Sequence, residues 1–287
     1  MSKNIFHIGY HKTATTWFQK KLYPHVSNFD IAKRSLIRSF FYEDKMYNFD
    51  NASDIIFCDE ELSGNIHNAG HSGFLTKQVA RKIGEFNNPK VVIFLRNQYD
   101  IISSSYLQYV KEGGNYSINK YVYHKEYLRS NRVSLFSFKH FNYYNLITNY
   151  IEIVGKKNVH IYLYEDFASN QKSFIKEFCD THDLKINLEK IDFTKTNNSY
   201  SYISYYLAKF INSFSHKNVL YKYYILHIPF LYEYARFVLS RINIFPINRR
   251  SILTKKIKRD IDKFYKESNN KISSEFGLDL KKYNYPT

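Results

Sequence analysis

The sequence has few cysteines, fewer acidic than basic residues and no long apolar run, and each scarcity excludes a class of protein. Its two cysteines, Cys58 and Cys179, are too few for a disulfide framework, so we expect a reducing, cytoplasmic environment. No stretch of about 18 uncharged apolar residues occurs, which argues against a membrane-spanning helix. Strand-like residues begin at Asn4, so we also expect no signal peptide.

Metal-ligand and nucleic-acid-binding patterns are missing as well. His67 and His71 lie four residues apart, but no third ligand follows in a matching pattern. We therefore predict that the protein binds no metal. None of the sequence patterns of nucleic-acid-binding modules occurs, so we expect no nucleic-acid partner.

Acidic residues are scarce, above all near the C-terminus. The chain has 42 Lys and Arg against 26 Asp and Glu, a formal net charge of +16. From Phe214 onward there are 15 basic and 6 acidic residues, so the last quarter carries a net +9, over half of the excess. Such a patch suits a polyanion, an anionic membrane face or a multiply phosphorylated cofactor. A solvated helical surface is the alternative.

The 287 residues alternate between apolar runs and amphipathic stretches. The runs predict strands at 4–8, Asp54–Cys58, Lys90–Leu95 and Val159–Tyr164, and helices are expected at Thr15–Tyr23, Gly73–Phe86, Tyr99–Val110, Asn142–Val154 and Asn170–His182. This order predicts an α/β fold with a mostly parallel central sheet flanked by helices. We expect residues 1–195 to form this core and the helical, basic residues 196–287 to form a lobe of the same domain.

The loop after the first strand has the features of an anion cradle. It reads Gly9-Tyr10-His11-Lys12-Thr13-Ala14-Thr15-Thr16 and leads into a helix. N–H groups and the positive dipole end at a helix start favour an anion. Lys12 adds a charge, and the threonines add short donors. A triphosphate loop requires G-x-x-x-x-G-K-[ST], and here the spacing from Gly to Lys is shorter and no Gly precedes the Lys.

A second anion anchor is predicted where another strand ends. Arg96 directly follows the strand Lys90–Leu95, and Ser104 lies eight residues further on, within the next helix. An Arg fork and a hydroxyl together can clamp a terminal phosphate. Ser103 and Ser105 leave the choice of serine open by one position. Ligands of parallel α/β folds bind at the carboxyl ends of strands, which is where both anchors lie.

These motifs resemble those of the sulfotransferases that use 3′-phosphoadenosine 5′-phosphosulfate (PAPS). The form G-x-x-K-T-x-T-T resembles their 5′-phosphosulfate loop, and Arg96 with Ser104 resembles their 3′-phosphate site. The resemblance runs in order from residue 4 to about 183, and 275–280 look like bacterial carbohydrate sulfotransferases. It implies a P-loop NTPase-like sulfotransferase fold and PAPS as cofactor, with contacts from Gly9, His11, Lys12, Thr13, Ala14, Thr15, Thr16, Arg96 and Ser104.

Two departures from the pattern of these enzymes are visible. Gln98 stands where their Arg is usually followed, two residues on, by Pro. The Gly-rich, Arg-Lys-Gly-type cofactor loop of the cytosolic animal enzymes is missing. A different basic segment must then supply the second contact to the 3′-phosphate, either Lys195–Ser201 or Arg249–Arg259.

Sulfuryl transfer needs positioning, charge neutralisation and one general base. Lys12 is expected to act at the bridging oxygen of the leaving phosphate. Glu60 is the predicted base, because related carbohydrate enzymes carry a catalytic Glu in a Ser-x-Glu stretch at this strand end, with Cys58 here at the Ser position. Asp59 and Glu61 remain rivals, since a shift of one residue turns a side chain to the other face. The histidines His67 and His71 are further alternatives.

The resemblance also implies an acceptor, and a different enzyme class remains open. We expect a carbohydrate or glycolipid hydroxyl as the acceptor. The aromatic and basic stretch Tyr221–Ile244 suits a peripheral membrane contact or, alternatively, a buried amphipathic helix. Ile55–Cys58 followed by Asp59-Glu60 also fits a Walker B strand, so a nucleotide kinase or ATPase is the alternative function.

Overall fold

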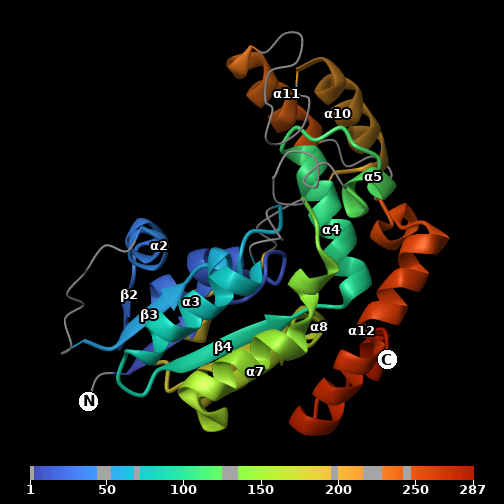
Figure 1. Ribbon diagram of the computed structural model, residues 1–287. Helices are drawn as coiled ribbons and strands as arrows, with labels where there is room; N and C mark the ends of the chain where they lie inside the picture. The colour runs from blue at the N-terminus through green and yellow to red at the C-terminus, as the bar shows by residue number, and fades with distance from the viewer. Residues whose placement is uncertain are drawn as a thin grey trace.

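The computed structural model of the chain describes residues 3–43, 53–67, 72–124, 135–194, 200–215, 228–241 and 247–287. Its centre is a five-stranded sheet in the order β2-β3-β1-β4-β5 (Figure 1). Every strand pairs in parallel with its neighbours. The strands are β1 (Asn4–His7), β2 (Asp30–Ile31), β3 (Ile55–Cys58), β4 (Lys90–Leu95) and β5 (Val159–Leu163). The predicted α/β fold with a parallel sheet is confirmed.

Helices connect the strands. Those that cover the sheet are α1 (Thr15–Trp17) with the π-helical turn η1 (Phe18–Leu22), α3 (Ser72–Gly84), α7 (Tyr143–Val154), α8 (Tyr164–Ser169) and α9 (Gln171–Thr181). Others are α2 (Arg34–Tyr42), α4 (Gln98–Lys111), α5 (Ile118–Val122), α10 (Tyr202–Ser215), α11 (Pro229–Arg241) and α12 (Lys255–Phe276). Short 3-10 turns are η2 (Tyr23–His25), η3 (Glu60–Ser63), η5 (Phe138–Phe141), η6 (Lys156–Asn158), η7 (Leu188–Lys190), η8 (Arg249–Ile252) and η9 (Lys281–Tyr283).

The central strands are apolar because helices cover both faces of the sheet. Successive side chains of a strand point to opposite faces. Ile5 accordingly packs with Trp17 and Phe18 on one face, whereas Phe6 packs against the layer that contains α3 and α7 on the other. Buried parallel strands therefore appear as continuous apolar runs, which is why the sequence located them to within about a residue. It missed β2, because two residues are too few to show a period, and it also missed the nine-residue helix α2.

The C-terminal helices pack into the same core as the sheet. Residues Tyr205 on α10 and Ile257, Ile261 and Tyr265 on α12 belong to one buried cluster with Phe6 of β1. Helix α12 packs against α4 and α7, and α10 packs against α4 and α11. Figure 1 shows α4 leading from the sheet toward α10 and α11 at one end of the molecule. A division of the domain near residue 195 stays a prediction.

The last residues of the chain are fastened to the ends of β4 and β5. The Asn97 side-chain amide donates to the carbonyls of Tyr283 and Asn284, at 2.8 and 2.7 Å. Tyr285 donates its hydroxyl to Glu165 at 2.9 Å, and Glu165 also accepts the Asn97 N–H at 2.8 Å. Glu165, one of the strand-end acids, therefore holds the C-terminal tail beside Arg96.

Gln98 has a partner in α12. Its amide donates to Asn269 Oδ1 at 2.9 Å, and Asn269 donates to the carbonyl of Pro286 at 2.8 Å. The residue that replaces the expected Pro thus joins the start of α4 to the C-terminal helix and tail. Within the described ranges, no helix has the length and apolar character needed to cross a bilayer.

We predict that Asn97→Ala destabilises the protein more than an ordinary N-cap substitution. Asn97 caps α4 by accepting the Tyr99 N–H at 3.0 Å and also holds the tail, so its loss should lower the free energy of unfolding by about 2–3 kcal/mol. Asn170 caps α9 alone, and Asn170→Ala should cost about 1 kcal/mol. Urea unfolding measures both, and equal losses would contradict a role of Asn97 in tail docking.

Candidate functional site

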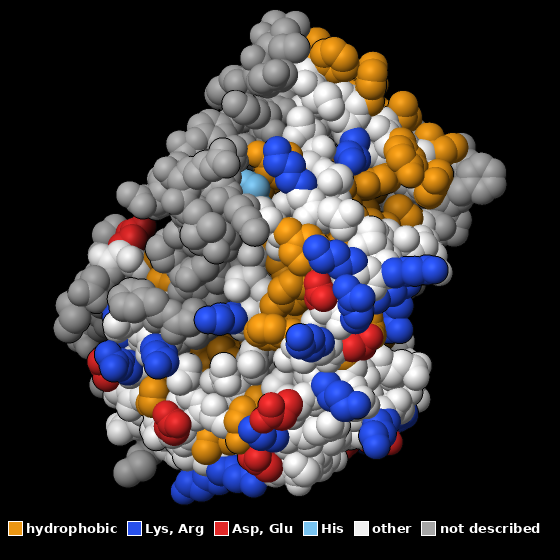
Figure 2. Space-filling view, turned by 45° about the vertical axis from the view of Figure 1, so that its right-hand side comes forward, with side chains coloured by type: hydrophobic (Ala, Val, Ile, Leu, Met, Phe, Trp, Pro, Cys, Tyr) orange, Lys and Arg blue, Asp and Glu red, His pale blue; other side chains and the backbone are white. Residues whose placement is uncertain are grey.

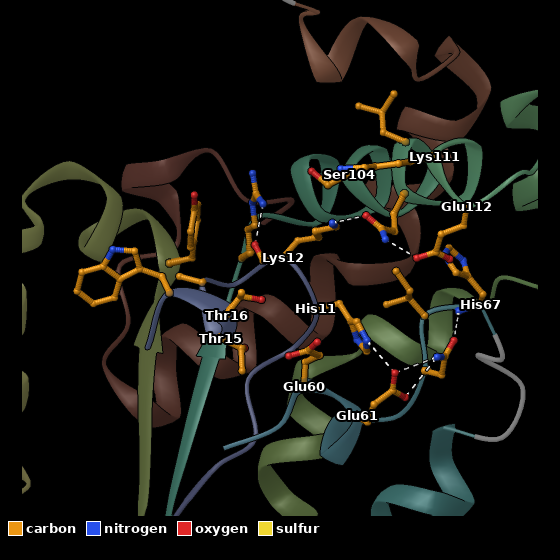
Figure 3. Close-up of a pocket in the computed structure, with 18 of the residues that line it drawn as sticks. His11, Lys12, Thr15, Thr16, Glu60, Glu61, His67, Ser104, Lys111 and Glu112 are labelled. Atoms are coloured by element: carbon orange, nitrogen blue, oxygen red, sulfur yellow. Dashed lines mark hydrogen bonds and ion pairs between the residues drawn. The ribbon is translucent and has the colours of Figure 1, made fainter. Parts of the chain in front are cut away.

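A cavity of about 700 Å³ lies at the carboxyl ends of β1, β3 and β4. The loop after β1 forms one wall, η3 after β3 forms another, and α4 forms a third (Figure 3). In this view Lys12 lies between Ser104 on α4 and Glu60 on η3. The predicted site residues that line the cavity are His11, Lys12, Ala14, Thr15, Thr16, Glu60, Arg96 and Ser104. The topology thus brings both predicted anion anchors and the predicted base to one cavity.

The loop between β1 and α1 has a strained backbone. Lys12 and Ala14 both have φ of 69°, the left-handed region that side chains other than Gly rarely adopt. A Cβ on Gly9 would lie 2.9 Å from Thr13 Oγ1, so only Gly fits at this position. Thr13 is buried, and its hydroxyl donates to the Tyr10 carbonyl. Gly9 and Thr13 therefore shape the loop, and neither of them lines the cavity.

Two polar atoms at the start of the following helix are buried without a partner. Thr15 Oγ1 and Trp17 Nε1 have no hydrogen-bond partner among the described residues, and both side chains line the cavity. Buried polar atoms are nearly always paired, so a pair of orphans at one wall indicates a ligand position.

Lys12 carries its charge in a basic environment. Its Nζ donates to Gln108 Oε1 at 2.6 Å. Although the side chain reaches solvent through the cavity, desolvation by the surrounding protein lowers its pKa to about 8. Glu112 opposes this shift, and Lys111, Arg96 and Arg249 add to it. A bound anion would relieve the repulsion among these cations.

Arg96 joins the two predicted anchors directly. Its Nη1 donates to the carbonyl of Lys12 at 2.7 Å, and its guanidinium lies 4.5 Å from the centre of the Tyr164 ring. Its own carbonyl accepts the Tyr143 hydroxyl at 2.6 Å. Arg96 is buried. These contacts fix the arginine at the cavity wall and hold the strained loop in place.

The three consecutive serines of α4 differ in their partners. Ser103 donates to the Tyr99 carbonyl and Ser105 donates to the Ile101 carbonyl. Ser104 Oγ is buried without a partner among the described residues and lines the cavity. The geometry thus separates Ser104 from its two neighbours.

Arg249, on η8, brings a further cation to this wall. It lines the cavity, and burial together with the charge of Arg96 lowers its pKa. It belongs to the predicted segment Arg249–Arg259. The neighbouring Arg250 points away and pairs with Asp100, with N–O distances of 2.8 and 2.6 Å. Of the other candidate segment, Lys195–Ser201, residues 195–199 lie outside the described ranges.

The three acids after β3 have different surroundings. Asp59 is wholly buried and pairs with Arg38 and Arg34, with Nε–Oδ2 distances of 2.9 and 3.2 Å. Burial alone would raise its pKa, but hydrogen bonds from both arginines and the Glu61 N–H outweigh burial and lower it. Asp59 does not line the cavity. It also caps η3, which makes its role structural.

Glu60 and Glu61 both line the cavity, but only Glu60 has an oxygen without a partner. Glu60 Oε1 accepts from Arg34 Nη2 at 3.0 Å, while its Oε2 has none among the described residues. Glu61 is occupied by His11 at 3.3 Å and by Asn65 at 3.1 Å. Among the three acids, Glu60 is the one placed to accept a proton.

The sequence did not reveal the acid–histidine pair on the far wall. Glu112, after α4, lies 3.3 Å from His67, and burial, which would raise its pKa, is outweighed by His67, Gln108 and Lys12, which lower it to about 2. The other ring nitrogen of His67 lies 3.3 Å from the Tyr121 hydroxyl. His67 Nε2 faces Glu112 at ion-pair distance but has no hydrogen-bond partner among the described residues. The spacing of Ser104, Gln108 and Lys111 along one helical face was the signal available for this wall. His71 lies outside the described residues.

Within the described ranges, no group of three His, Cys, Asp or Glu side chains is placed to hold a metal ion. The cavity is instead lined by fixed cations. Lys and Arg therefore supply its positive charge.

The comparison with known proteins identifies the fold. No family model and no curated protein matches the sequence. Among solved structures, the chain is similar to a sulfotransferase from Alicyclobacillus acidocaldarius, with a TM-score of 0.58, 11% identity and coverage of 99% of both chains. The mouse sulfotransferase SULT7A1 complexed with PAP is also matched, with a TM-score of 0.48, 15% identity and coverage of 98% of this chain and 89% of the mouse one.

The fold and the cavity therefore define an α/β protein with a parallel sheet and a strained, cation-bearing loop after its first strand. More particularly, the likeness over nearly the whole chain shows the sulfotransferase fold that the loop predicted. At 11% identity this likeness concerns the fold. The activity must be argued from the residues of the cavity.

We predict that Asp59→Asn lowers stability in a pH-dependent way. The pKa of Asp59 is lowered by folding, so its ion pairs stabilise the protein above the ordinary pKa of about 4, and this contribution disappears as the pH falls through the lowered value. At pH 7 the loss should be roughly 2–3 kcal/mol, less than for a fully buried pair because Arg34 and Arg38 are partly exposed.

Urea unfolding of the wild-type protein and the variant at several pH values measures this difference. Asp183→Asn is the control, because Asp183 forms an exposed pair with Lys3 and should show no comparable loss. A difference between wild type and Asp59→Asn that stays constant down to pH 3 would contradict the assignment.

Proposed function

We propose that the protein is a PAPS-dependent sulfotransferase. The observation that carries the proposal is the joining of two anion anchors in one cavity, the strained loop around Lys12 and the group Arg96, Ser104 and Arg249. A nucleotide with phosphate at both its 5′ and 3′ positions needs two such anchors. A triphosphate needs one continuous cradle instead.

The buried polar atoms that have no partner among the described residues indicate where the cofactor would be bound. The 5′-phosphosulfate fits against the N–H groups of the loop, Lys12 and the Thr15 hydroxyl. The 3′-phosphate fits against Arg96 and Ser104, and Arg249 supplies the second cationic contact. These assignments give partners to Thr15 Oγ1 and Ser104 Oγ and leave His11 Nδ1 and Trp17 Nε1 without one among the described residues.

Transfer proceeds in line. The acceptor oxygen forms a bond to sulfur, the bond between sulfur and the bridging phosphate oxygen breaks, and the acceptor proton passes to the base. Lys12, whose pKa of about 8 keeps it mostly protonated at pH 7, neutralises the leaving phosphate. Glu60 Oε2 accepts the proton, and Arg34 holds the other oxygen of the same carboxylate.

The acceptor that suits this cavity is a carbohydrate hydroxyl. The cavity lining also presents amide, imidazole and carboxylate groups of Asn65, His67 and Glu112. Groups of this kind hydrogen-bond to sugar hydroxyls, whereas a phenol or steroid would require an apolar pocket. A glycan or glycolipid acceptor is therefore proposed.

A nucleotide kinase or ATPase is not favoured. Its Walker B carboxylate would be Asp59, which must face a metal ion. Asp59 instead lies buried between Arg34 and Arg38 and outside the cavity lining.

The nucleotide-binding prediction uses neighbouring serines as a matched pair. Ser104→Ala should weaken binding of 3′-phosphoadenosine 5′-phosphate by roughly tenfold, because a charge-assisted hydrogen bond is lost, while Ser103→Ala should bind within about twofold of wild type. Isothermal titration calorimetry without Mg²⁺ measures both. Tight ATP binding that requires Mg²⁺, with no binding of the bisphosphate, would overturn the proposal in favour of a kinase.

The transfer prediction concerns the base. Glu60→Gln keeps the size of the side chain and should lower kcat by about 10²–10⁴-fold without changing nucleotide affinity. Glu61→Gln is the control, because Glu61 is engaged by His11 and Asn65, and it should retain most of kcat. Labelled PAPS with a panel of glycans, glycolipids and phenols gives the rates. Transfer to phenols alone would refute the carbohydrate acceptor, and a Glu61→Gln loss as large as that of Glu60→Gln would refute the base assignment.

A further inference from the structure

The exposed apolar side chains of the described residues are concentrated on two helices. Of 16 large hydrophobic side chains that are exposed, 12 lie between 202 and 238, on or beside α10 and α11. Figure 2 shows hydrophobic side chains gathered at the upper right of the molecule. These twelve residues, which we call the apolar face, are Tyr202, Ile203, Tyr206, Leu207, Phe210, Phe214, Ile228, Phe230, Leu231, Tyr234, Phe237 and Val238.

Most of the buried side of helix α10 is small or polar. Its buried residues are Ser204, Tyr205, Ala208, Asn212 and Ser215, of which Tyr205 and Ala208 pack in the core cluster. Asn212 donates to the carbonyls of Val110 and Gly114 at 2.7 and 2.9 Å, which anchors α10 on the end of α4. A helix at the surface of a water-soluble domain normally places its apolar side inward. Because α10 instead leaves Tyr202, Tyr206, Phe210 and Phe214 outward, the apolar face is the kind of exposed surface that contacts an apolar medium or partner.

The net charge of residues 200–241 indicates what kind of surface the apolar face would contact. Residues 200–241 contain five basic residues, Lys209, Lys217, Lys222, Arg236 and Arg241, and one acid, Glu233, a net +4. Arg241 lies over the Phe237 ring at 3.8 Å, so a cation accompanies the aromatic side chains. Aromatic residues flanked by Lys and Arg suit the boundary between lipid headgroups and acyl chains, and anionic headgroups attract the cations. A second copy of the chain, with its net charge of +16, is repelled.

The apolar face also lies next to the cavity. Tyr200, two residues before α10, lines the cavity together with Lys111 and Glu112 at the end of α4. Helix α10 packs against α4 at this end. A membrane or partner that contacts α10 and α11 would therefore lie beside this end of the cavity.

We propose that the apolar face docks the protein on the surface of an anionic lipid bilayer, without crossing it. Membrane binding is independent of the reaction. Docking would also bring a membrane-borne glycolipid to the cavity, and this second part of the proposal rests on the proposed sulfuryl transfer. Vesicle binding and transfer to a water-soluble glycan are measured separately. The membrane proposal can therefore fail while the sulfotransferase proposal holds, and the reverse.

The test is flotation of the full chain with vesicles. Wild type should bind equimolar phosphatidylcholine and phosphatidylglycerol vesicles, weakly bind pure phosphatidylcholine, and lose binding at high salt. Phe210 and Phe230 are 65% and 78% exposed, so the double variant Phe210→Glu/Phe230→Glu should fold. Its binding to the anionic vesicles should fall by roughly tenfold or more, because two aromatic side chains no longer enter the lipid.

The control double variant carries the same charge change elsewhere. Ile153 on α7 and Phe264 on α12 are each 39% exposed, and Ile153→Glu/Phe264→Glu should keep binding within about threefold of wild type, since added charge alone acts weakly at long range. If the glutamate variant fails to fold, Phe210→Ser/Phe230→Ser replaces it with the same expectation. Thermal unfolding of each variant establishes folding.

Three results would overturn the proposal. The first is wild-type protein that does not float with the anionic vesicles. The second is an equal loss of binding in the test and control variants, which would make the effect one of charge alone. The third is a dimer in sedimentation velocity that Phe210→Glu/Phe230→Glu dissociates, with no vesicle binding, which would assign the apolar face to a second copy of the chain.

Discussion

The hydrogen bond from Arg96 to the carbonyl of Lys12 connects the parts on which the proposed site depends. It fixes a loop whose backbone is strained at Lys12 and Ala14, and it places a buried guanidinium beside the loop's own cation. The protein holds Lys12, Arg96 and Arg249 together in one cavity wall. Desolvation by burial lowers the pKa of Lys12 and of Arg249, and the charge of Arg96 adds to both shifts. Concentrated positive charge in a cavity stores repulsion that a polyanion releases on binding.

The acidic residues at the strand ends have two kinds of role. Asp59 and Glu165 stabilise the structure, whereas Glu60 is the proposed base. Asp59 neutralises Arg34 and Arg38 and caps η3, so its contacts stabilise the turn that carries Glu60. Glu165 accepts from Asn97 and Tyr285 and thereby fastens the C-terminal tail to the strand that positions Arg96. Among the described residues, Glu60 is the one acid of the three after β3 that has a carboxylate oxygen without a partner, while Arg34 binds its other oxygen. The proposed role of Glu60 as the base rests on this difference.

The C-terminal residues contribute more than a covering layer. Helix α12 and the tail pack on α4 and on the strand ends, η8 carries Arg249 to the cavity wall, and α10 is bonded to the end of α4. Helix α4 therefore lines the cavity and also packs against the C-terminal helices α10 and α12. A ligand that orders α4 at Ser104 would stabilise the same helix on which α10 rests, so binding at the cavity and packing of the C-terminal helices share one scaffold.

The sequence by itself determined the parallel sheet, the loop after β1 that carries Lys12 and the position of Arg96 at a strand end. Buried parallel strands are continuous apolar runs, and the loop is formed by consecutive residues. Both can therefore be recognised from the sequence alone. The tertiary structure alone decided which of Ser103, Ser104 and Ser105 faces the cavity. It also decided which of the three acids after β3 has an oxygen without a partner among the described residues. It also brought Glu112 to His67 and Arg249 to Arg96. These outcomes depend on side-chain direction and on contacts between residues far apart in the chain, where a turn of one residue on a helix or strand exchanges the buried side for the open one.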